Sequence, residues 1–295
     1  MRSSGVLALL SAAFAAKVHA SSPLYALGLA PFTGSRCGST NPPLALLEDA
    51  RLDPADDVTA STLGAAKSIA VKTYVHIVTT PASANNFTQR MVDDQLRAMN
   101  AAYNPLSISF ALVNTSRTVN AAWAAAATDA DERAMKAALR RGSYADLNLY
   151  FLSDLGGGLL GFCYFPETLS GLGSNGPDTL LLDGCINLAG SLPGGPVANY
   201  DQGKTAVHET GHWFGVFHVF QGDSCLGAGD FVADTPAQKN ATRGCPVGAD
   251  SCPGRRGLDS ITNFMDYSYD ACMTEFTQGQ KKRMFRSYKK YRAGK

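Results

Sequence analysis

Hydrophobic and polar positions alternate most clearly in the part of the chain that begins near residue 70. Residues 71–77 and residues 108–112 each alternate with a period of two, which is typical of half-buried strands. Between them, residues 88–103 place their apolar side chains on one helical face. The pattern predicts a strand, a helix and a second strand in that order.

The alternation of strands and helices continues downstream. Residues 129–141 are predicted to form a surface helix, with acidic residues at its start and arginines at its end, as the helix dipole favours. Residues 146–153 are predicted to form a third strand. Residues 160–166 are predicted to form a fourth strand at a sheet edge, because a proline ends it. Beyond Gly215, regular structure is predicted to be sparse until a final helix begins near Thr277.

Residues 1–20 have the three parts of a secretory signal peptide. Arg2 supplies a positive charge, residues 6–16 an apolar stretch, and residues 18–20 a cleavage site of small residues. The apolar stretch is shorter than the roughly 20 residues that span a bilayer, so a membrane anchor is not expected. We therefore expect the chain to be secreted into the extracellular space.

Residues 21–60 are rich in Pro, Ser, Gly and Asp and show no sustained period. Such a stretch is typical of a prosegment or an extended N-terminal strap, and we do not expect it to supply core elements. We assign residues 21–65 to this N-terminal strap and residues 66–295 to one main domain.

Charge excludes one class of partner. Lys and Arg number 26 and Asp and Glu number 25, which gives a net charge of +1. Without a basic stripe, the chain is a poor match to nucleic acid. The basic residues of the final helix are interpreted as a solvated face rather than a membrane-binding one. We expect neither nucleic acid nor membrane as a partner, and we expect a monomer.

One segment, residues 205–218 (TAVHETGHWFGVFH), carries the candidate chemistry. A helix of about 3.6 residues per turn presents His208 and His212 from one face. Both imidazoles can then reach one ion at the distance of about 2.0–2.1 Å that zinc requires. Gly215 permits a tight turn that brings His218 back as a third ligand. One coordination position stays open, which is typical of a catalytic zinc site.

Glu209 follows the first histidine and is expected to stay out of the ligand set of the metal. Zinc lowers the pKa of a bound water to about 7, and Glu209 can take its proton while the water attacks a peptide carbonyl. The carboxyl group then passes this proton to the departing amine. The segment predicts a zinc-dependent endopeptidase that cleaves extended peptides or proteins.

Export changes the interpretation of the cysteines, because disulfides form in oxidising compartments. Their number is odd, so one is left over. The seven are Cys37, Cys163, Cys185, Cys225, Cys245, Cys252 and Cys272. Three Asn-x-Ser/Thr triplets, at Asn86, Asn114 and Asn240, are candidate glycosylation sites of a secreted protein.

The pattern His-Glu-x-x-His-x-x-Gly-x-x-His resembles the metzincin signature, whose members have a methionine turn beneath the metal. Residues 263–267 (NFMDY) look like that turn, and the Cys-rich stretch before them is most similar to the pappalysin family, especially its secreted microbial and fungal metalloproteases. The resemblance covers roughly residues 71–291. It implies an α+β (α/β) metzincin-type fold with a twisted mixed sheet and an active-site helix. An upper subdomain would end near residue 215, and a lower, irregular and disulfide-braced subdomain (216–295) would end in a helix.

The same resemblance implies roles for individual residues. Met265 is expected to form an apolar floor under the histidines. Tyr267 is expected near the zinc, where its hydroxyl can bind the metal or stabilise the oxyanion. Without the resemblance, both would be interpreted as ordinary core residues. Residues 160–165 are expected to be a rim strand on which a peptide pairs antiparallel, and the alternative is a plain edge strand covered by residues 167–178.

The resemblance also implies a pairing of the cysteines. Two crossed disulfides would brace the segment after the zinc helix, and the residual pair would form a third. The implied pairs are Cys225–Cys252, Cys245–Cys272 and Cys163–Cys185. Asp230 and Asp234 lie in the same segment, where they are expected either to bind Ca²⁺ or to belong to a solvated acidic loop.

Cys37 is left over and lies in the N-terminal strap. Metzincin zymogens can place a prosegment cysteine at the metal position that water needs, and residues 35–38 (SRCG) look similar. Cys37 is thus implied to be a latency switch, and the alternative is an unused thiol or a different disulfide pattern. Asp270 resembles part of the pocket for the residue after the scissile bond, which implies a preference for Arg or Lys there. The alternative is a solvated Asp.

Two other functions stay open. A catalytically silent binding protein could keep the zinc scaffold, although it has no need of an intact Glu209. A hydrolase of non-peptide amides would use a closed, deep pocket, whereas an exposed strand edge beside the metal suits a peptide.

Overall fold

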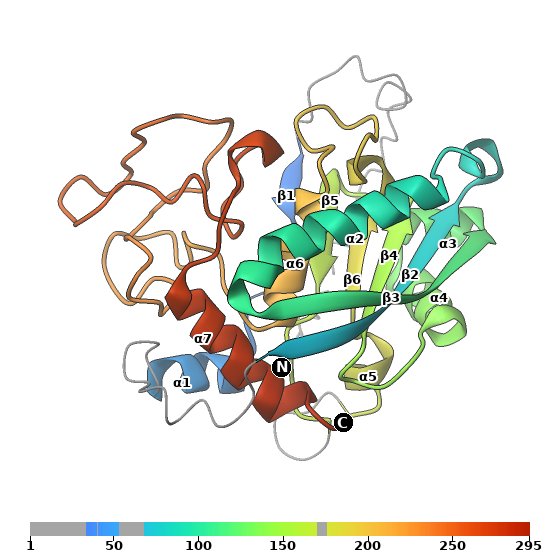
Figure 1. Cartoon of the computed structure of the whole chain (residues 1–295), viewed down its shortest axis with the longest axis horizontal. Helices are drawn as coiled ribbons and strands as arrows, with labels where there is room; N and C mark the ends of the chain where they lie inside the picture. The colour runs from blue at the N-terminus through green and yellow to red at the C-terminus, as the bar shows by residue number, and fades with distance from the viewer. Residues whose placement is uncertain (1–33, 40, 53–67, 170–175) are drawn as a thin grey trace, which may run out of the picture.

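Residues 34–39, 41–52, 68–169 and 176–295 are described by the computed structural model, and the predicted signal peptide lies outside them. Their centre is a six-stranded sheet with the strand order β1-β5-β6-β4-β2-β3 (Figure 1). The strands are β1 (Ser35–Cys37), β2 (Ile69–Thr79), β3 (Ile108–Val119), β4 (Leu147–Leu152), β5 (Leu159–Cys163) and β6 (Cys185–Leu188). The α-helices are α1 (Leu44–Leu52), α2 (Gln89–Tyr103), α3 (Ala121–Ala125), α4 (Asp129–Leu139), α5 (Asp178–Leu181), α6 (Lys204–Trp213) and α7 (Gln278–Ser287).

The sheet is mixed, as the family resemblance implied. β2 pairs in parallel with β3 on one side and with β4 on the other, and β4 pairs in parallel with β6. β5 runs antiparallel to β6. β1, from the N-terminal strap, runs parallel to β5 and covers the edge that β5 would otherwise expose.

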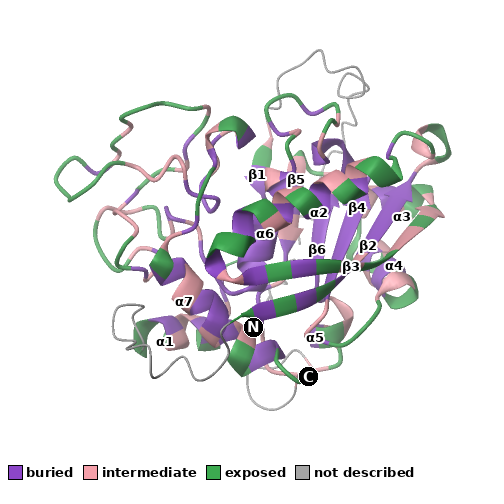
Figure 2. Cartoon of the chain, viewed as in Figure 1, coloured by how far each residue is buried: buried purple, intermediate pink, exposed green. Residues whose placement is uncertain are grey.

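Alternate side chains of the central strands pack on opposite faces of the sheet. Ile77 and Phe151 belong to the hydrophobic cluster that includes α2 and α6, whereas Val78 and Leu152 pack with residues of α3 and α4. Helices therefore cover both faces, and every residue of β4 is buried. Figure 2 shows the central strands in purple beneath helices whose outer faces are green.

Two predicted helix starts are explained by their caps. The Thr88 hydroxyl accepts a hydrogen bond from the Met91 N–H at the start of α2. Thr277 and Gln280 form a reciprocal capping box at the start of α7. Each cap satisfies backbone donors that lack a partner in the first turn of a helix, so these boundaries could be read from local sequence.

The structure corrects the prediction for the N-terminal strap. Residues 21–60 were expected to supply no core element, yet they contain β1 and α1, and Cys37, Leu46 and Ala50 are buried. The sequence also gave no indication of β6 or α3. These elements are short, so each has too few apolar positions to reveal a period.

The chain between α6 and α7 is irregular and contains two disulfides, Cys225–Cys252 and Cys245–Cys272. A third, Cys163–Cys185, joins β5 to β6. These are the pairs that the family resemblance implied. The candidate glycosylation sites Asn86, Asn114 and Asn240 are all exposed, and their occupancy stays a prediction. In the part of the chain that the structure describes, no helix is long and apolar enough to cross a membrane.

Candidate active site

Helix α6 brings the first two histidines of the motif into the interior, where His208 and His212 are fully buried. After the helix, Gly215 has a φ of +83°, a left-handed conformation that glycine adopts without steric cost. A Cβ at this position would lie 2.7 Å from the Ser287 hydroxyl, so the turn also needs glycine for space. This turn directs the chain back toward α6 and places His218 beside the other two histidines.

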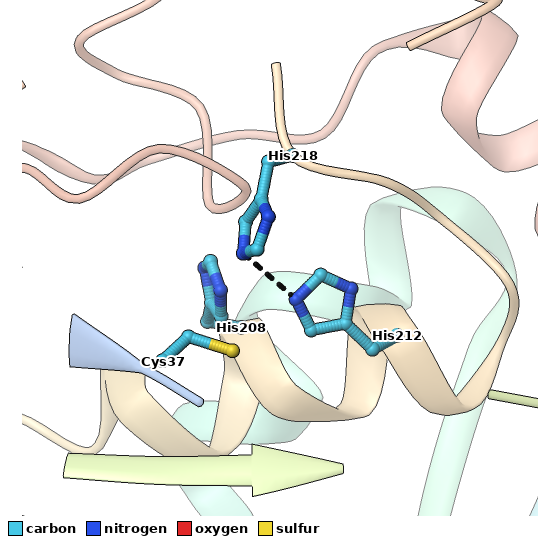
Figure 3. A group of neighbouring side chains, drawn as sticks. All are labelled: Cys37, His208, His212 and His218. Atoms are coloured by element: carbon cyan, nitrogen blue, oxygen red, sulfur yellow. Dashed lines mark hydrogen bonds between the residues drawn. The ribbon is translucent and has the colours of Figure 1, made fainter. Parts of the chain in front are cut away.

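Figure 3 shows the three imidazoles and the Cys37 thiol gathered around one point. Nε2 of His212 lies 3.1 Å from Nε2 of His218. The ring centroid of His208 lies 4.9 Å from that of His212 and 5.2 Å from that of His218. One donor atom from each of the four residues lies within 4.8 Å of all the others. This spacing suits a single ion held at about 2.0–2.3 Å from nitrogen and sulfur ligands.

The hydrogen bonds of Nδ1 determine which ring nitrogen of each histidine is available to a metal. Nδ1 of His208 lies 2.7 Å from the Phe264 carbonyl oxygen, and Nδ1 of His212 lies 2.8 Å from the Val216 carbonyl oxygen. A carbonyl only accepts, so each Nδ1 carries the proton and each Nε2 keeps its lone pair. Nε2 of His208 is buried without a hydrogen-bond partner.

Burial also lowers the pKa of all three imidazoles, of His212 to about 4. The neutral form that a metal requires is therefore favoured. The donor set fits a zinc ion.

Glu209 is fully buried beside the histidines. Its Oε2 lies 3.3 Å from the Cys37 sulfur and 3.3 Å from the Ser39 hydroxyl, and both donate to it, while Oε1 has no hydrogen-bond partner. Burial raises the pKa of Glu209 to about 8. Gly161 on β5 allows this approach, because a Cβ there would lie 3.0 Å from Cγ of Glu209. The result is a carboxyl group with an unused oxygen at the edge of the histidine cluster.

Met265 and Tyr267 both lie close to this cluster. Met265 is fully buried, and its sulfur would lie 2.4 Å from a Cβ at Gly211, so it packs directly against α6. Met265 is positioned by its backbone N–H, which donates to the Asn263 side-chain oxygen at 2.9 Å. The Tyr267 ring centroid lies 5.1 Å from that of His218, and its hydroxyl donates to the Cys37 carbonyl at 3.1 Å.

The N-terminal strap occupies the space in front of these residues. The Ser35 N–H donates to the Gly158 carbonyl at 2.9 Å, and the Gly38 N–H donates to the Gly161 carbonyl at 2.8 Å. The Ser39 hydroxyl also accepts the N–H of Cys163 at 3.0 Å. The strap is thus an added strand that covers the histidines, the Glu209 carboxyl and the Tyr267 hydroxyl together.

Arg36 is buried next to the cluster, and the groups that surround its guanidinium are called the Arg36 pocket below. Its guanidinium donates to Asp270 Oδ1 at 2.9 Å and to the Ser268 carbonyl at 2.8 Å, and it lies 5.2 Å from the centre of the Tyr200 ring. Both members of the ion pair are buried. Asp270 Oδ2 accepts the Lys204 N–H at 3.2 Å, at the start of α6. The pocket therefore provides a carboxylate, a carbonyl and an aromatic face to one guanidinium.

Comparison with known proteins identifies the family. The sequence of residues 145–288 matches the family model of peptidase family M43, which is described as pregnancy-associated plasma protein-A. An extracellular metalloprotease of Pyricularia oryzae is 49% identical over 273 residues, which make up 90% of this chain and 93% of that protein. The chain belongs to the pappalysin family. Extracellular metalloprotease 1 of Coccidioides posadasii is 47% identical and matches 90% of this pappalysin and 94% of its own length.

A solved structure shows the same fold. Mature mirolysin of Tannerella forsythia, in complex with a cleaved peptide, matches this pappalysin with a TM-score of 0.62 and 27% identity, over 74% of this chain and 90% of that one. Together these findings confirm the predicted family, the α+β metzincin fold and the class of enzyme. The chain is a metalloprotease, and its substrates are peptides or proteins.

Asp230 and Asp234, the residues considered for Ca²⁺, also have structural partners. Asp230 Oδ1 accepts the Thr235 hydroxyl at 2.7 Å, and Asp234 Oδ2 accepts the Gly279 N–H at 2.8 Å. Asp230 Oδ2 is buried without a partner, and burial raises the pKa of this carboxyl to about 7. Within the described ranges, the group of His, Cys, Asp and Glu side chains that is spaced for a metal is the one around His208.

Sequence reasoning missed three residues of the site in this pappalysin. Arg36 has no sequence feature of its own beyond its place beside Cys37, although its guanidinium forms a buried ion pair with Asp270. Ser39 contacts both Glu209 and β5. Tyr200, which faces the guanidinium, lies in a loop without a recognisable motif. The arginine beside Cys37 was the one available signal, because an arginine carried into the site with Cys37 would need an acidic partner there.

Proposed function

We propose that this pappalysin is a secreted zinc endopeptidase in which His208, His212 and His218 bind the metal and Glu209 transfers protons. The observation that supports this most is the convergence of three imidazoles beside a buried carboxyl group with an unused oxygen. The names of the extracellular relatives support secretion. The alternative of a catalytically silent scaffold is not favoured, because those relatives are named metalloproteases.

When bound, a zinc ion supplies a Lewis acid that polarises the scissile carbonyl and lowers the pKa of a neighbouring water. Glu209 accepts a proton from the attacking water and delivers it to the nitrogen of the departing amine. Tyr267 donates a hydrogen bond to the developing oxyanion once the strap has left, because its present acceptor is the strap carbonyl of Cys37. Met265 packs against α6 and takes no part in proton transfer.

We propose that an extended peptide binds along β5, in the place that β1 takes in the unprocessed chain. The main-chain carbonyls of Gly158 and Gly161 accept hydrogen bonds from the strap and can accept them from a substrate. Pairing through the main chain depends little on side chains, as an endopeptidase requires. The cleaved peptide bound by mirolysin supports peptide binding in a relative of this fold.

The Cys37 thiol keeps the unprocessed enzyme latent in this proposal. Its sulfur lies with the three histidine nitrogens and donates to Glu209, so it competes for both parts of the machinery. β1 runs parallel to β5, whereas the proposed substrate runs antiparallel. The strap main chain is therefore reversed relative to a substrate.

Replacing Cys37 with Ala in the unprocessed chain is expected to raise the hydrolysis of a short fluorogenic peptide by about tenfold or more, because a sulfur ligand is lost. After proteolytic removal of the strap, parent and variant should have equal activity. A variant that stays as silent as its parent contradicts the switch. So does a mass map that finds Cys37 in a disulfide.

The Arg36 pocket suggests the substrate preference. Because β1 is reversed relative to a substrate, a residue before Cys37 takes the place of a residue after the scissile bond. We therefore propose that Asp270 selects a basic residue at that position. Arginine is favoured over lysine, since the Ser268 carbonyl and the Tyr200 ring suit a planar guanidinium.

Asp270→Asn is expected to lower kcat/KM for peptides with Arg after the scissile bond by about 10- to 100-fold, the cost of losing a charged hydrogen-bond partner. Peptides with Leu at that position should change little. The backbone N–H of Gln202, in the loop before α6, donates to Asp270 Oδ2 at 3.0 Å. Asp201→Asn changes the neighbouring acidic side chain of that loop and is the control, which should keep the preference. Cleavage profiling on a peptide library provides the measurement, and a parent enzyme that accepts only apolar residues there would contradict the assignment.

We propose Ca²⁺ as a second ion at Asp230 and Asp234. The Oδ2 of Asp230 is buried without a hydrogen-bond partner, and an oxygen ligand of this kind suits Ca²⁺. Such an ion would neutralise a carboxylate inside the disulfide-braced segment.

A further inference from the structure

The second half of the described strap, helix α1, makes a contact of its own with the main domain. Residues 38–43 connect β1 to this helix. Figure 1 shows α1 beside α7, at the opposite end of the molecule from α3 and α4. Leu46 and Ala50 of α1 belong to a separate hydrophobic cluster with Phe165, Phe217 and Tyr291 of the main domain. The strap therefore has a second contact surface of its own.

This surface is built on the segment that positions the third histidine. Leu46 reaches the turn after α6, where its Cδ1 would lie 3.4 Å from a Cβ on Gly215. Phe165 packs edge-on against Phe217, with ring centroids 5.7 Å apart, and against His212, with centroids 5.0 Å apart. Phe165 thus connects the hydrophobic cluster that contains Leu46 to the metal ligand His212.

Only one face of α1 takes part in the contact. Leu46 is 4% exposed, whereas Leu44 is 67% exposed and Leu52 is 85% exposed on the same short helix. Leucine is present on both faces, so hydrophobicity alone does not determine the orientation. The buried face is selected by what it meets on the main domain.

Polar contacts fix the orientation of the helix. Both carboxylate oxygens of Asp49 accept hydrogen bonds from the Lys290 ammonium, at 2.6 and 2.5 Å. The Tyr291 hydroxyl donates to the same carboxylate at 2.5 Å. The Arg51 guanidinium lies 5.9 Å from the centre of the Phe231 ring. The contact therefore combines an apolar centre with a charged rim, as specific interfaces do.

We propose that the surface of Phe165, Phe217, Lys290 and Tyr291 is a second binding site for the strap, which holds residues 44–52 on the enzyme without using the metal ligands. The proposal rests on the latency proposed for the strap and names its second anchor. Two linked contacts bind more tightly than either alone, because each keeps the other at high effective concentration. A cut between α1 and β2 would leave both anchors in place, so the fragment stays bound as an inhibitor until α1 detaches.

The labelling rate of Cys37 measures this anchor in the full-length chain. Cys37 is buried and is the free cysteine, so a thiol reagent reaches it only when the strap opens. Labelling with iodoacetamide in excess chelator removes any contribution from a metal–sulfur bond. Leu46→Ala is expected to raise this rate by about tenfold or more, since truncating a buried leucine weakens its packing strongly. Leu52→Ala makes the same chemical change on the exposed face and should label like the parent.

A second pair of variants tests the charged rim without touching the apolar centre. Lys290→Ala removes the partner of Asp49 and is expected to label about two- to fivefold faster than the parent, with the difference shrinking at high salt. Its neighbour Lys289, which is exposed, provides the control Lys289→Ala. If Leu46→Ala fails to fold, as judged by its thermal transition, the comparison of Lys290→Ala with Lys289→Ala tests the proposed binding site in its place.

Equal labelling rates for Leu46→Ala and Leu52→Ala in folded protein overturn the anchor, as do equal rates for the two lysine variants. Failure of the latency proposal has a different signature. Adding zinc should slow the labelling of Cys37 further if its sulfur binds the metal. If zinc does not change the labelling rate of Cys37 while Leu46→Ala still labels faster than the parent, the second binding site at α1 is supported and the role of Cys37 as a metal ligand is contradicted.

Discussion

His212→Ala is expected to lose most of its zinc and all measurable peptide hydrolysis. The substitution leaves two of the three imidazoles, and a catalytic zinc site needs three protein ligands. The Nδ1 contact of His212 with the Val216 carbonyl is lost as well, so the turn toward His218 loses one of its supports. Zinc per protein molecule, measured by elemental mass spectrometry after dialysis, should fall from about one to a small fraction.

His76→Asn is the matched control for this loss. His76 is also buried, but its ring nitrogens are paired with the Ser116 hydroxyl at 2.7 Å and the Asn148 side-chain oxygen at 3.0 Å, away from the cluster. This variant should keep its zinc. Because a metal that binds the native state stabilises it, a chelator should lower the melting temperature of the parent and of the control but not that of His212→Ala. A His212→Ala chain with full zinc content would contradict the ligand set.

Glu209→Gln is expected to lower kcat by about 10²- to 10⁴-fold while zinc content and melting temperature stay close to those of the parent. Glutamine has nearly the same shape as glutamate, so the packing against Gly161 is kept. Its amide cannot accept the proton of the attacking water, and the loss is therefore confined to proton transfer. Because the strap covers the site, parent and variant both need the same trimming by an added protease before hydrolysis is compared.

The core of the candidate site could be predicted from local sequence. His208 and His212 share a helical face because of their spacing, and Gly215 marks the turn that returns His218. The starts of α2 and α7 could likewise be predicted from their N-capping residues, because one or two nearby side chains satisfy the first backbone donors of each helix. Each of these features depends on residues within a few positions of one another.

What the sequence did not reveal depends on contacts across the whole chain. Arg36 is separated from its partner Asp270 by 234 positions, and Ser39 from Glu209 by 170. α1 has nine residues with leucine on both faces, so its buried face is chosen by the surface it meets. The periodicity of a short segment cannot predict these long-range partners, because the surface that the segment contacts forms only when the sheet and α7 have folded.

Zinc content and kcat, measured on the same trimmed preparations of the parent, Glu209→Gln and Glu275→Gln, test the central claim most directly. Glu275 is an exposed carboxylate that accepts the Thr262 hydroxyl, so its replacement controls for the loss of one charge. We predict about one zinc per molecule in all three chains, with kcat reduced by about 10²- to 10⁴-fold only in Glu209→Gln. A zinc-loaded Glu209→Gln enzyme that turns over as fast as its parent would contradict the account.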